Sequence, residues 1–103
     1  MSDGAEYHYY IRHLLEQIGC ERERQEAAKE AGRFAWTCAD PVSNAERLVI
    51  LAREFGEVCR ATEVSGDRRA ELIAARQGLR AELIQVAAVA LAWIEGLDRE
   101  VGR

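Results

Sequence analysis

The sequence predicts an all-α protein, a helical bundle of three to four helices. The helix-favouring residues Ala, Glu, Arg and Leu dominate the chain, and Pro41 is its only proline. Apolar residues also recur every three or four positions, as they do on one face of a helix. With 103 residues the chain is expected to form a single domain, residues 1–103. On folding, a domain of this size buries only about two-thirds of the surface that its unfolded chain exposes, so we expect oligomerisation to complete the core.

The first helix is expected from about Ala5 to Ala31, with Gly32 closing it. The pattern turns polar in its second half, CERERQEAAKE, which therefore needs a partner to stay ordered. In the loop RFAWTCADP that follows, Phe34 and Trp36 are large rings that must pack against something. The first half of the helix carries an apolar face made of Tyr7, Tyr10, Ile11, Leu14, Leu15 and Ile18.

The second helix is expected to begin at a cap provided by Ser43 or Asn44, with Glu46 in its first turn, and to end at Ser65 and Gly66. Its apolar residues are spaced alternately three and four positions apart, which predicts a single packed face. The residues of this face are Leu48, Leu51, Phe55 and Val58.

A short helical piece from Asp67 to Arg76, a break at Gly78 and a last helix complete the expected fold. The middle of the last helix is apolar nearly all round, which is typical of a helix buried on several sides. A monomer of three or four helices cannot easily bury it, so we expect a subunit interface and a homo-oligomer, a dimer or a tetramer. The heptad-spaced stripe is Leu79, Leu83, Val86, Ala90, Trp93 and Leu97.

Charge and cysteine content exclude several classes of protein. There are 14 Lys and Arg against 18 Asp and Glu, a net charge of −4, and no basic run is longer than Arg68 and Arg69, so nucleic acid is not an expected partner. The three cysteines show no C-x-x-C spacing, and the sequence has neither a signal peptide nor an apolar run of membrane length. A cytoplasmic protein without a membrane partner is expected.

Two matched polar steps carry the main functional signal: Glu54 with Glu57, and Glu82 with Gln85. Residues three apart share a helix face, and each step lies one position before a pair of apolar residues. The side chains are therefore expected to converge in a cleft at the edge of the packed stripe. Oxygen ligands on facing helices suit Mg²⁺, with Mn²⁺ as a second possibility, and bound Mg²⁺ commonly recruits phosphates. The competing interpretation is a solvated helix face, because a Glu-rich chain forms such steps by chance.

These steps resemble the paired motif of the all-α nucleoside triphosphate pyrophosphohydrolases of the MazG-like superfamily, E-x-x-E on one helix and E-x-x-D on a later one. Here they read E54-F-G-E57 and E82-L-I-Q85. The flanking strings ERLVILAREFGEVCRA and LRAELIQVAAVALAWIEGLD, and ERERQ near the end of the first helix, are also similar to small members of the superfamily. The resemblance covers roughly half of the chain.

The resemblance implies that Glu54, Glu57 and Glu82 are catalytic metal ligands. They would hold Mg²⁺ against a nucleoside triphosphate, which is hydrolysed to the monophosphate and pyrophosphate, with housecleaning of noncanonical nucleotides as the implied role. Hydrolysis of this kind requires charge neutralisation and alignment more than covalent chemistry. No phosphate-binding Gly-rich loop occurs in the sequence. Trp36 could stack on a nucleobase, although filling the end of the bundle is the more ordinary role for it.

Two positions depart from the family pattern. Gln85 stands where the pattern has Asp, which keeps an amide oxygen as a weaker ligand but removes one negative charge. Arg53 stands where relatives often have Glu, and it would either repel a cation or bind phosphate through its guanidinium group. The same two residues support an alternative function, a non-catalytic helical module that binds nucleotide or a protein partner at a degenerate metal site.

Overall fold

The computed structural model describes residues 4–63 and 68–102, and these ranges are helical apart from the loop between the first two helices and short ends. The three helices are α1 (Gly4–Glu30), α2 (Asn44–Thr62) and α3 (Arg69–Val101). No strand occurs within the described ranges. The all-α class predicted from the sequence is therefore confirmed.

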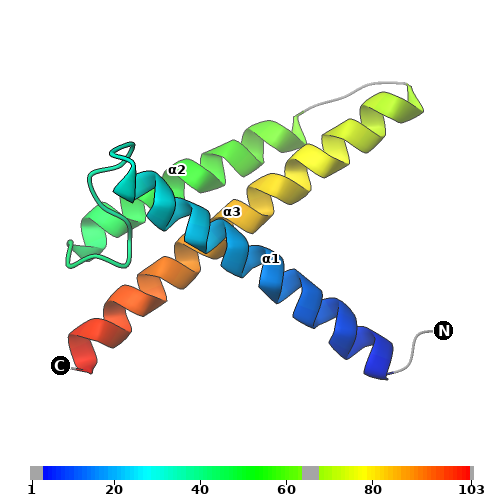
Figure 1. Cartoon of the computed structure of the whole chain (residues 1–103). Helices are drawn as coiled ribbons and strands as arrows, with labels where there is room; N and C mark the ends of the chain where they lie inside the picture. The colour runs from blue at the N-terminus through cyan, green and yellow to red at the C-terminus, as the bar shows by residue number, and fades with distance from the viewer. Residues whose placement is uncertain (1–3, 64–67, 103) are drawn as a thin grey trace.

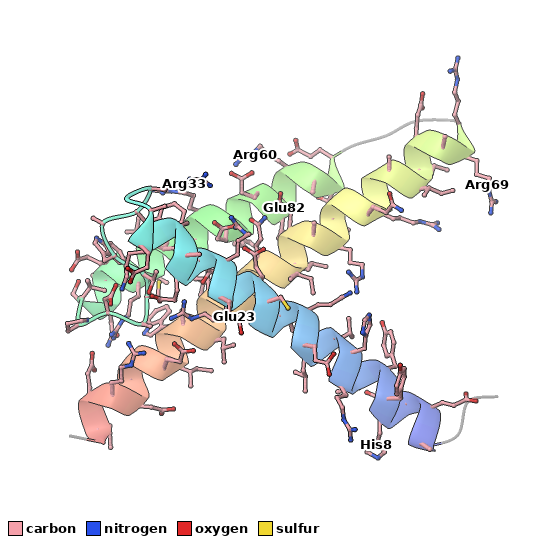
Figure 2. The ribbon with its side chains drawn as sticks, viewed as in Figure 1. His8, Glu23, Arg33, Arg60, Arg69 and Glu82 are labelled. Carbon is pink, nitrogen blue, oxygen red and sulfur yellow. The ribbon has the colours of Figure 1, made fainter. Side chains whose placement is uncertain are left out.

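The helices α2 and α3 lie side by side and run in opposite directions, and α1 crosses over α3 near its middle (Figure 1). The C-terminal half of α1 lies over the other two helices, whereas its N-terminal half extends away from them as an arm that ends near His8 (Figure 2). α3 packs against both α1 and α2, but no Cα of α1 lies within 8 Å of a Cα of α2. This arrangement leaves a space over α3 between the other two helices.

Both predicted helix boundaries next to the loop are confirmed. Gly32 has a φ of +82°, and the Gly32 and Arg33 amides donate to carbonyls of the last turn of α1. Ser43 caps α2, because its side chain accepts a hydrogen bond from the Glu46 amide at 3.1 Å and the Glu46 carboxylate accepts one from the Ser43 amide at 3.0 Å.

The core is small and lies where the loop 33–43 packs against α3. Its buried residues are Cys38, Ala39, Val89 and Ala92, and Trp36, Ile50, Leu51 and Trp93 pack around them. A buried arginine, Arg47, fixes the loop to α2: it donates to the Cys38 carbonyl and to the Asp40 carbonyl, each at 2.9 Å. The same loop carries Trp36, so these hydrogen bonds help to set the position of that ring.

Polar contacts hold the second half of α1 in place. The buried Arg22 donates to Glu95 of α3 at 2.8 Å and pairs with Glu26 at 2.6 Å. Lys29 pairs with Asp40 of the loop at 3.1 Å. The expectation that this half of the helix needs a partner is met by α3 and the loop.

The predicted break at Gly78 is wrong, because α3 continues through it as one helix of 33 residues. Gly in a helix costs about 1 kcal/mol relative to Ala, and the strong helix formers on both sides outweigh that cost. The sequence predicts that the second helix ends at Ser65 and Gly66 and that a short helical piece begins at Asp67. Those three positions lie outside the described residues, and α2 ends at Thr62.

Parts of the predicted apolar faces stay exposed in the single chain. Phe55 of α2 and Leu83 of α3 are 61% and 51% exposed, and Leu48 and Leu97 are exposed as well. On α3 the buried residues are Ala88, Val89, Ala92 and Gly96, nearly opposite Leu83. Periodicity identifies an apolar face but cannot say whether that face packs within one chain or against a second one.

The single chain is elongated and exposes much apolar surface. Its radius of gyration is 16.2 Å, whereas a compact domain of this length has about 13 Å. None of the described helices has the combination of length and apolarity required to cross a membrane. Large apolar side chains that are exposed include Tyr7, Tyr9, Tyr10 and Leu15 on α1, Val49 on α2, and Leu72, Ile73, Leu91, Ile94 and Val101 on α3.

Candidate functional site

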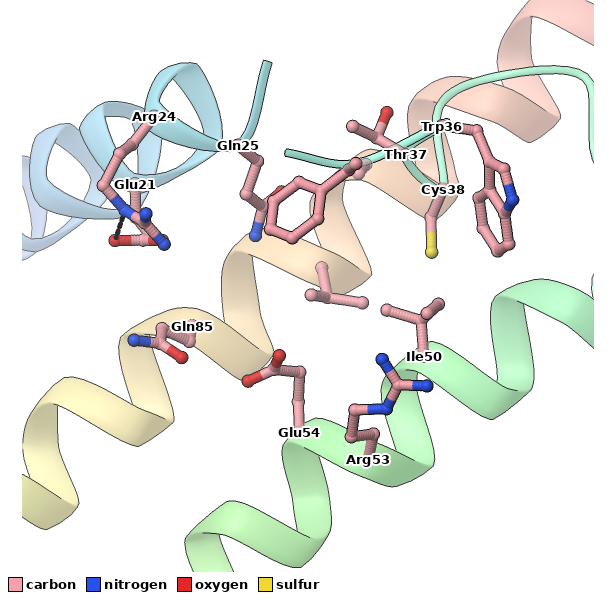
Figure 3. Close-up of a pocket in the computed structure, with 13 residues that line it drawn as sticks. Glu21, Arg24, Gln25, Trp36, Thr37, Cys38, Ile50, Arg53, Glu54 and Gln85 are labelled. Carbon is pink, nitrogen blue, oxygen red and sulfur yellow. Dashed lines mark hydrogen bonds and ion pairs between the residues drawn. The ribbon is translucent and has the colours of Figure 1, made fainter. Parts of the chain in front are cut away.

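A cleft of about 130 Å³ occupies the space between α1 and α2. α3 forms its floor, the loop after α1 closes one end, and Figure 3 shows side chains from all four elements pointing into it. In that view Glu21, Arg24 and Gln85 lie toward one end, and Trp36, Cys38 and Ile50 toward the other. The end next to the loop is the more apolar one, and Arg53 also reaches it beside Ile50. Its remaining lining residues are Gln25, Phe34, Thr37, Arg53, Glu54, Val89 and Ala92.

Four of the residues predicted from the sequence meet in this cleft. Glu54 and Arg53 enter it from α2, Gln85 from α3 and Trp36 from the loop. They come from three segments distant in the sequence. One residue of each polar step, Glu54 and Gln85, therefore lines the same cleft.

The other two predicted residues do not line the cleft itself. Glu57 lies one turn further along α2 and pairs with Arg60 at 2.7 Å. Glu82 lies on α3 where it passes α2 (Figure 2), one turn before Gln85. Both carboxylates nevertheless interact electrostatically with Glu54.

Glu54 lies on the wall of the cleft among other acidic side chains. Burial raises its pKa, and the neighbouring carboxylates of Glu82, Glu57 and Glu21 raise it further, against a smaller opposing effect of Arg53. The Oε2 atoms of Glu54 and Glu82 are both buried without a hydrogen-bond partner. A buried carboxylate oxygen without a partner is costly, and a bound cation or a proton would relieve that cost.

The oxygen atoms of the site meet some of the requirements of a divalent cation. Carboxylate oxygens of Glu54 and Glu82, with the amide oxygen of Gln85, are the hard ligands that Mg²⁺ and Mn²⁺ accept. Among the described residues, however, no group of three or more His, Cys, Asp or Glu side chains is arranged to hold a metal ion. The two partnerless oxygens fit a cation, and a complete ligand shell would require additional ligands such as water or phosphate.

Sequence reasoning missed the contribution of α1. Glu21 and Arg24 line the cleft, and Glu21 accepts hydrogen bonds from Arg24 Nε at 3.0 and 2.9 Å. Their polar half-helix was expected only to need a partner. The signal in the sequence was the ERERQ string, of which Glu21, Arg24 and Gln25 line the cleft.

The loop presents its residues to the cleft in a fixed conformation. The Thr37 amide donates to the Asp40 carboxylate at 2.8 Å, and the Thr37 hydroxyl donates to Glu26 of α1 at 2.8 Å. Trp36 packs against the core from this loop, whereas Phe34 lines the cleft and is 46% exposed. Burial raises the pKa of the Cys38 thiol, which keeps it protonated and unsuited to nucleophilic attack.

No family model matches the chain, and no similar protein was found among the curated proteins or the solved structures. Chemically, the site offers partnerless carboxylate oxygens, arginine side chains and an apolar end beside them. Such an arrangement is able to bind a ligand that has both an anionic end and a flat apolar end, with a cation between the acids and the anion.

Proposed function

We propose that the protein is a Mg²⁺-dependent nucleoside triphosphate pyrophosphohydrolase of the MazG-like type. It would convert a nucleoside triphosphate to the monophosphate and pyrophosphate, with noncanonical nucleotides as candidate substrates. The observation that carries the proposal is the pair of buried, partnerless oxygens on Glu54 and Glu82, one from each of the two helices.

The acids have distinct roles in this proposal. Glu54 and Glu82 would bind the cation through their partnerless oxygens, and Gln85 would add its amide oxygen or orient a water molecule. Glu57 would join them after leaving Arg60, an exposed pair that costs little to break. When bound, Mg²⁺ neutralises charge on phosphate oxygens and lowers the pKa of a water molecule.

The cleft supplies orientation as well as charge. Arg53 is proposed to contact phosphate oxygens through its planar guanidinium group, because it lies beside Glu54 on the cleft wall. Trp36, with Ile50 and Val89, would hold the base at the apolar end. A nucleotide bound this way has its phosphates at the acids and its base against the loop.

A homo-oligomer is part of the proposal because the cleft of one chain is small. Its volume of about 130 Å³ is below the roughly 300 Å³ at the lower end of ligand sites. The exposed Phe55 follows Glu54 directly in α2, so a second copy packed against Phe55 would lie next to the site.

The first test is pyrophosphate release from a panel of canonical, deoxy and modified nucleoside triphosphates, with Mg²⁺ or Mn²⁺ and with EDTA controls. We expect metal-dependent release that Glu54→Gln and Glu82→Gln each lower by at least about a hundredfold, since charge stabilisation of the transition state is the largest contribution at such sites. Glu23→Gln, an exposed acid on α1 outside the cleft, is the matched control. Undiminished hydrolysis by Glu57→Ala would contradict the role given to Glu57.

The alternative is a non-catalytic helical module, which the absence of a preformed metal group in the described residues favours. Calorimetry with Mn²⁺ and a nonhydrolysable triphosphate distinguishes the two. The enzyme should take up metal and nucleotide cooperatively, whereas the module should take up little metal and release no pyrophosphate from any nucleotide in the panel.

A further inference from the structure

α1 also forms a wall of the cleft, and the charged residues of this wall belong to neither polar step. Arg24 of α1 faces the cleft, and Glu21, one turn earlier, faces the same way (Figure 3). Residues three apart on a helix share a face, so the two side chains meet each other as well as the cleft.

Glu21 holds Arg24 by one edge of its guanidinium group. The carboxylate accepts hydrogen bonds from Nε at 3.0 and 2.9 Å and from Nη2, whereas Nη1 takes part in none of these bonds. The Glu21 side chain is only 15% exposed and so makes a fixed support, while the Arg24 side chain is 55% exposed and accessible to a ligand. Two-point pairing of this kind fixes the direction of the remaining N–H groups.

The charges of the cleft lining cancel, so an anion at Arg24 would depend on a cation at Glu54 for further attraction. The lining carries two carboxylates, Glu21 and Glu54, and two guanidinium groups, Arg24 and Arg53. Hydrogen bonding to Glu21 raises the pKa of Arg24, and the charge of Glu54 contributes, which places the guanidinium within electrostatic reach of the buried acid. An oxyanion between Arg24 and a cation at Glu54 would therefore be attracted from both sides.

We propose that Arg24, held by Glu21, is the contact that α1 makes with the phosphate groups of the ligand. The inference rests on the proposed function for the identity of the ligand, a nucleoside triphosphate. The contact itself requires only a polyphosphate anion. It gives α1 a role in binding, because α1 then closes the end of the cleft where Glu21 and Arg24 lie.

The test measures binding of inorganic tripolyphosphate in the presence of Mg²⁺ by calorimetry, a readout that needs no turnover. Arg24→Gln is expected to weaken binding about tenfold or more, because a charge-assisted hydrogen bond to phosphate is lost. Arg24→Lys keeps the charge without the planar group, and an intermediate loss of about threefold is expected. Arg76→Gln, an exposed arginine of α3 outside the cleft lining, is the matched control and should bind like the wild type.

Kinetics add a second readout if the protein hydrolyses a nucleotide. A contact with phosphate groups that is similar in the bound substrate and in the transition state predicts a higher KM for Arg24→Gln at nearly unchanged kcat. A circular-dichroism melt of each variant checks that the fold is retained.

The outcomes separate the inference from the proposed function. Tripolyphosphate binding that depends on Arg24, in a protein that hydrolyses no nucleotide, supports the inference and contradicts the proposed enzyme. Hydrolysis that depends on Glu54, with Arg24→Gln binding tripolyphosphate as tightly as Arg76→Gln does, overturns the inference and leaves the enzyme standing. Failure of the wild-type protein to bind tripolyphosphate at all overturns the inference.

Discussion

Gly96 is the position where α3 passes closest to the buried Arg47. A Cβ atom at this position would lie 2.7 Å from the Cys38 carbonyl oxygen and would overlap the Arg47 guanidinium group. Arg47 is 1% exposed and holds the loop through two carbonyls, so it cannot move aside without breaking those hydrogen bonds. The absence of a side chain at Gly96 is therefore what allows the loop and α3 to pack together.

We predict that Gly96→Ala lowers the free energy of unfolding by about 1–3 kcal/mol, because overpacking outweighs the better helix propensity of Ala. Gly78→Ala is the matched control on the same helix, since nothing lies within 4 Å of a Cβ built there. It should raise stability by about 0.5–1 kcal/mol. Urea unfolding followed by circular dichroism measures both, and equal effects of the two substitutions would contradict the packing argument.

Glu26 makes stability depend on pH at the junction of α1 and the loop. Burial opposes ionisation, but hydrogen bonds from Arg22 and Thr37 and the charge of Arg22 outweigh it and lower the pKa of Glu26 to about 2. A carboxyl group whose pKa is lower in the folded state stabilises the fold above its unfolded pKa of about 4.5. That stability is lost as the pH falls through about 2.

We therefore predict that Glu26→Gln is less stable than the wild type at neutral pH and that the difference shrinks as the pH falls from about 4.5 toward 2. Thermal melts over that pH range measure the difference. Glu23→Gln, exposed on the same helix, provides the control and should show no comparable trend. A deficit for Glu26→Gln that stays constant with pH would indicate that its ionisation is not involved.

At the scale of the elements, the sequence predicted the class of the fold, the end of α1 at Gly32 and the cap of α2, because local chemistry determines each of them. Ser43 and Glu46 form a capping box whatever the rest of the chain does. The break at Gly78 was wrong because the cost of one glycine is small beside the helix formers around it. The place of Arg24 in the cleft was missed because it depends on how α1 crosses α3, and no local pattern encodes that crossing.

One side-chain oxygen at the start of α2 links Arg47, which holds the loop, to Trp93 of α3. Asn44 Oδ1 accepts hydrogen bonds from Arg47 Nη1 at 2.9 Å and from Trp93 Nε1 of α3 at 3.0 Å. Asn44→Ala is predicted to lower the free energy of unfolding by about 1 kcal/mol, because Trp93 Nε1 loses its acceptor and Arg47 Nη1 keeps only Glu100, at 3.0 Å. Asn44→Asp keeps the oxygen acceptor and is expected to retain most of the stability. Chemical denaturation compares them, and equal losses would show that the shared acceptor does not matter.

At the scale of the whole molecule, the single chain has more surface than its mass explains. It exposes 7575 Å², whereas a folded monomer of 11.6 kDa exposes about 5,800 Å². A standard interface buries about 800 Å² per partner, so the surplus exceeds what one such interface would cover. On α3 the exposed apolar side chains Leu83, Ile94, Leu97 and Val101 form one stripe, opposite the face that packs on the loop.

Because this stripe is apolar and exposed, we predict that the protein self-associates through the outer face of α3. The double substitution Leu83→Glu and Ile94→Glu should convert the oligomer to monomer at micromolar concentration, because it places two charges in the contact. Leu83→Met and Ile94→Met conserve the volume and should keep the oligomer. Sedimentation velocity measures the state, and a wild-type chain that sediments as a monomer contradicts the prediction.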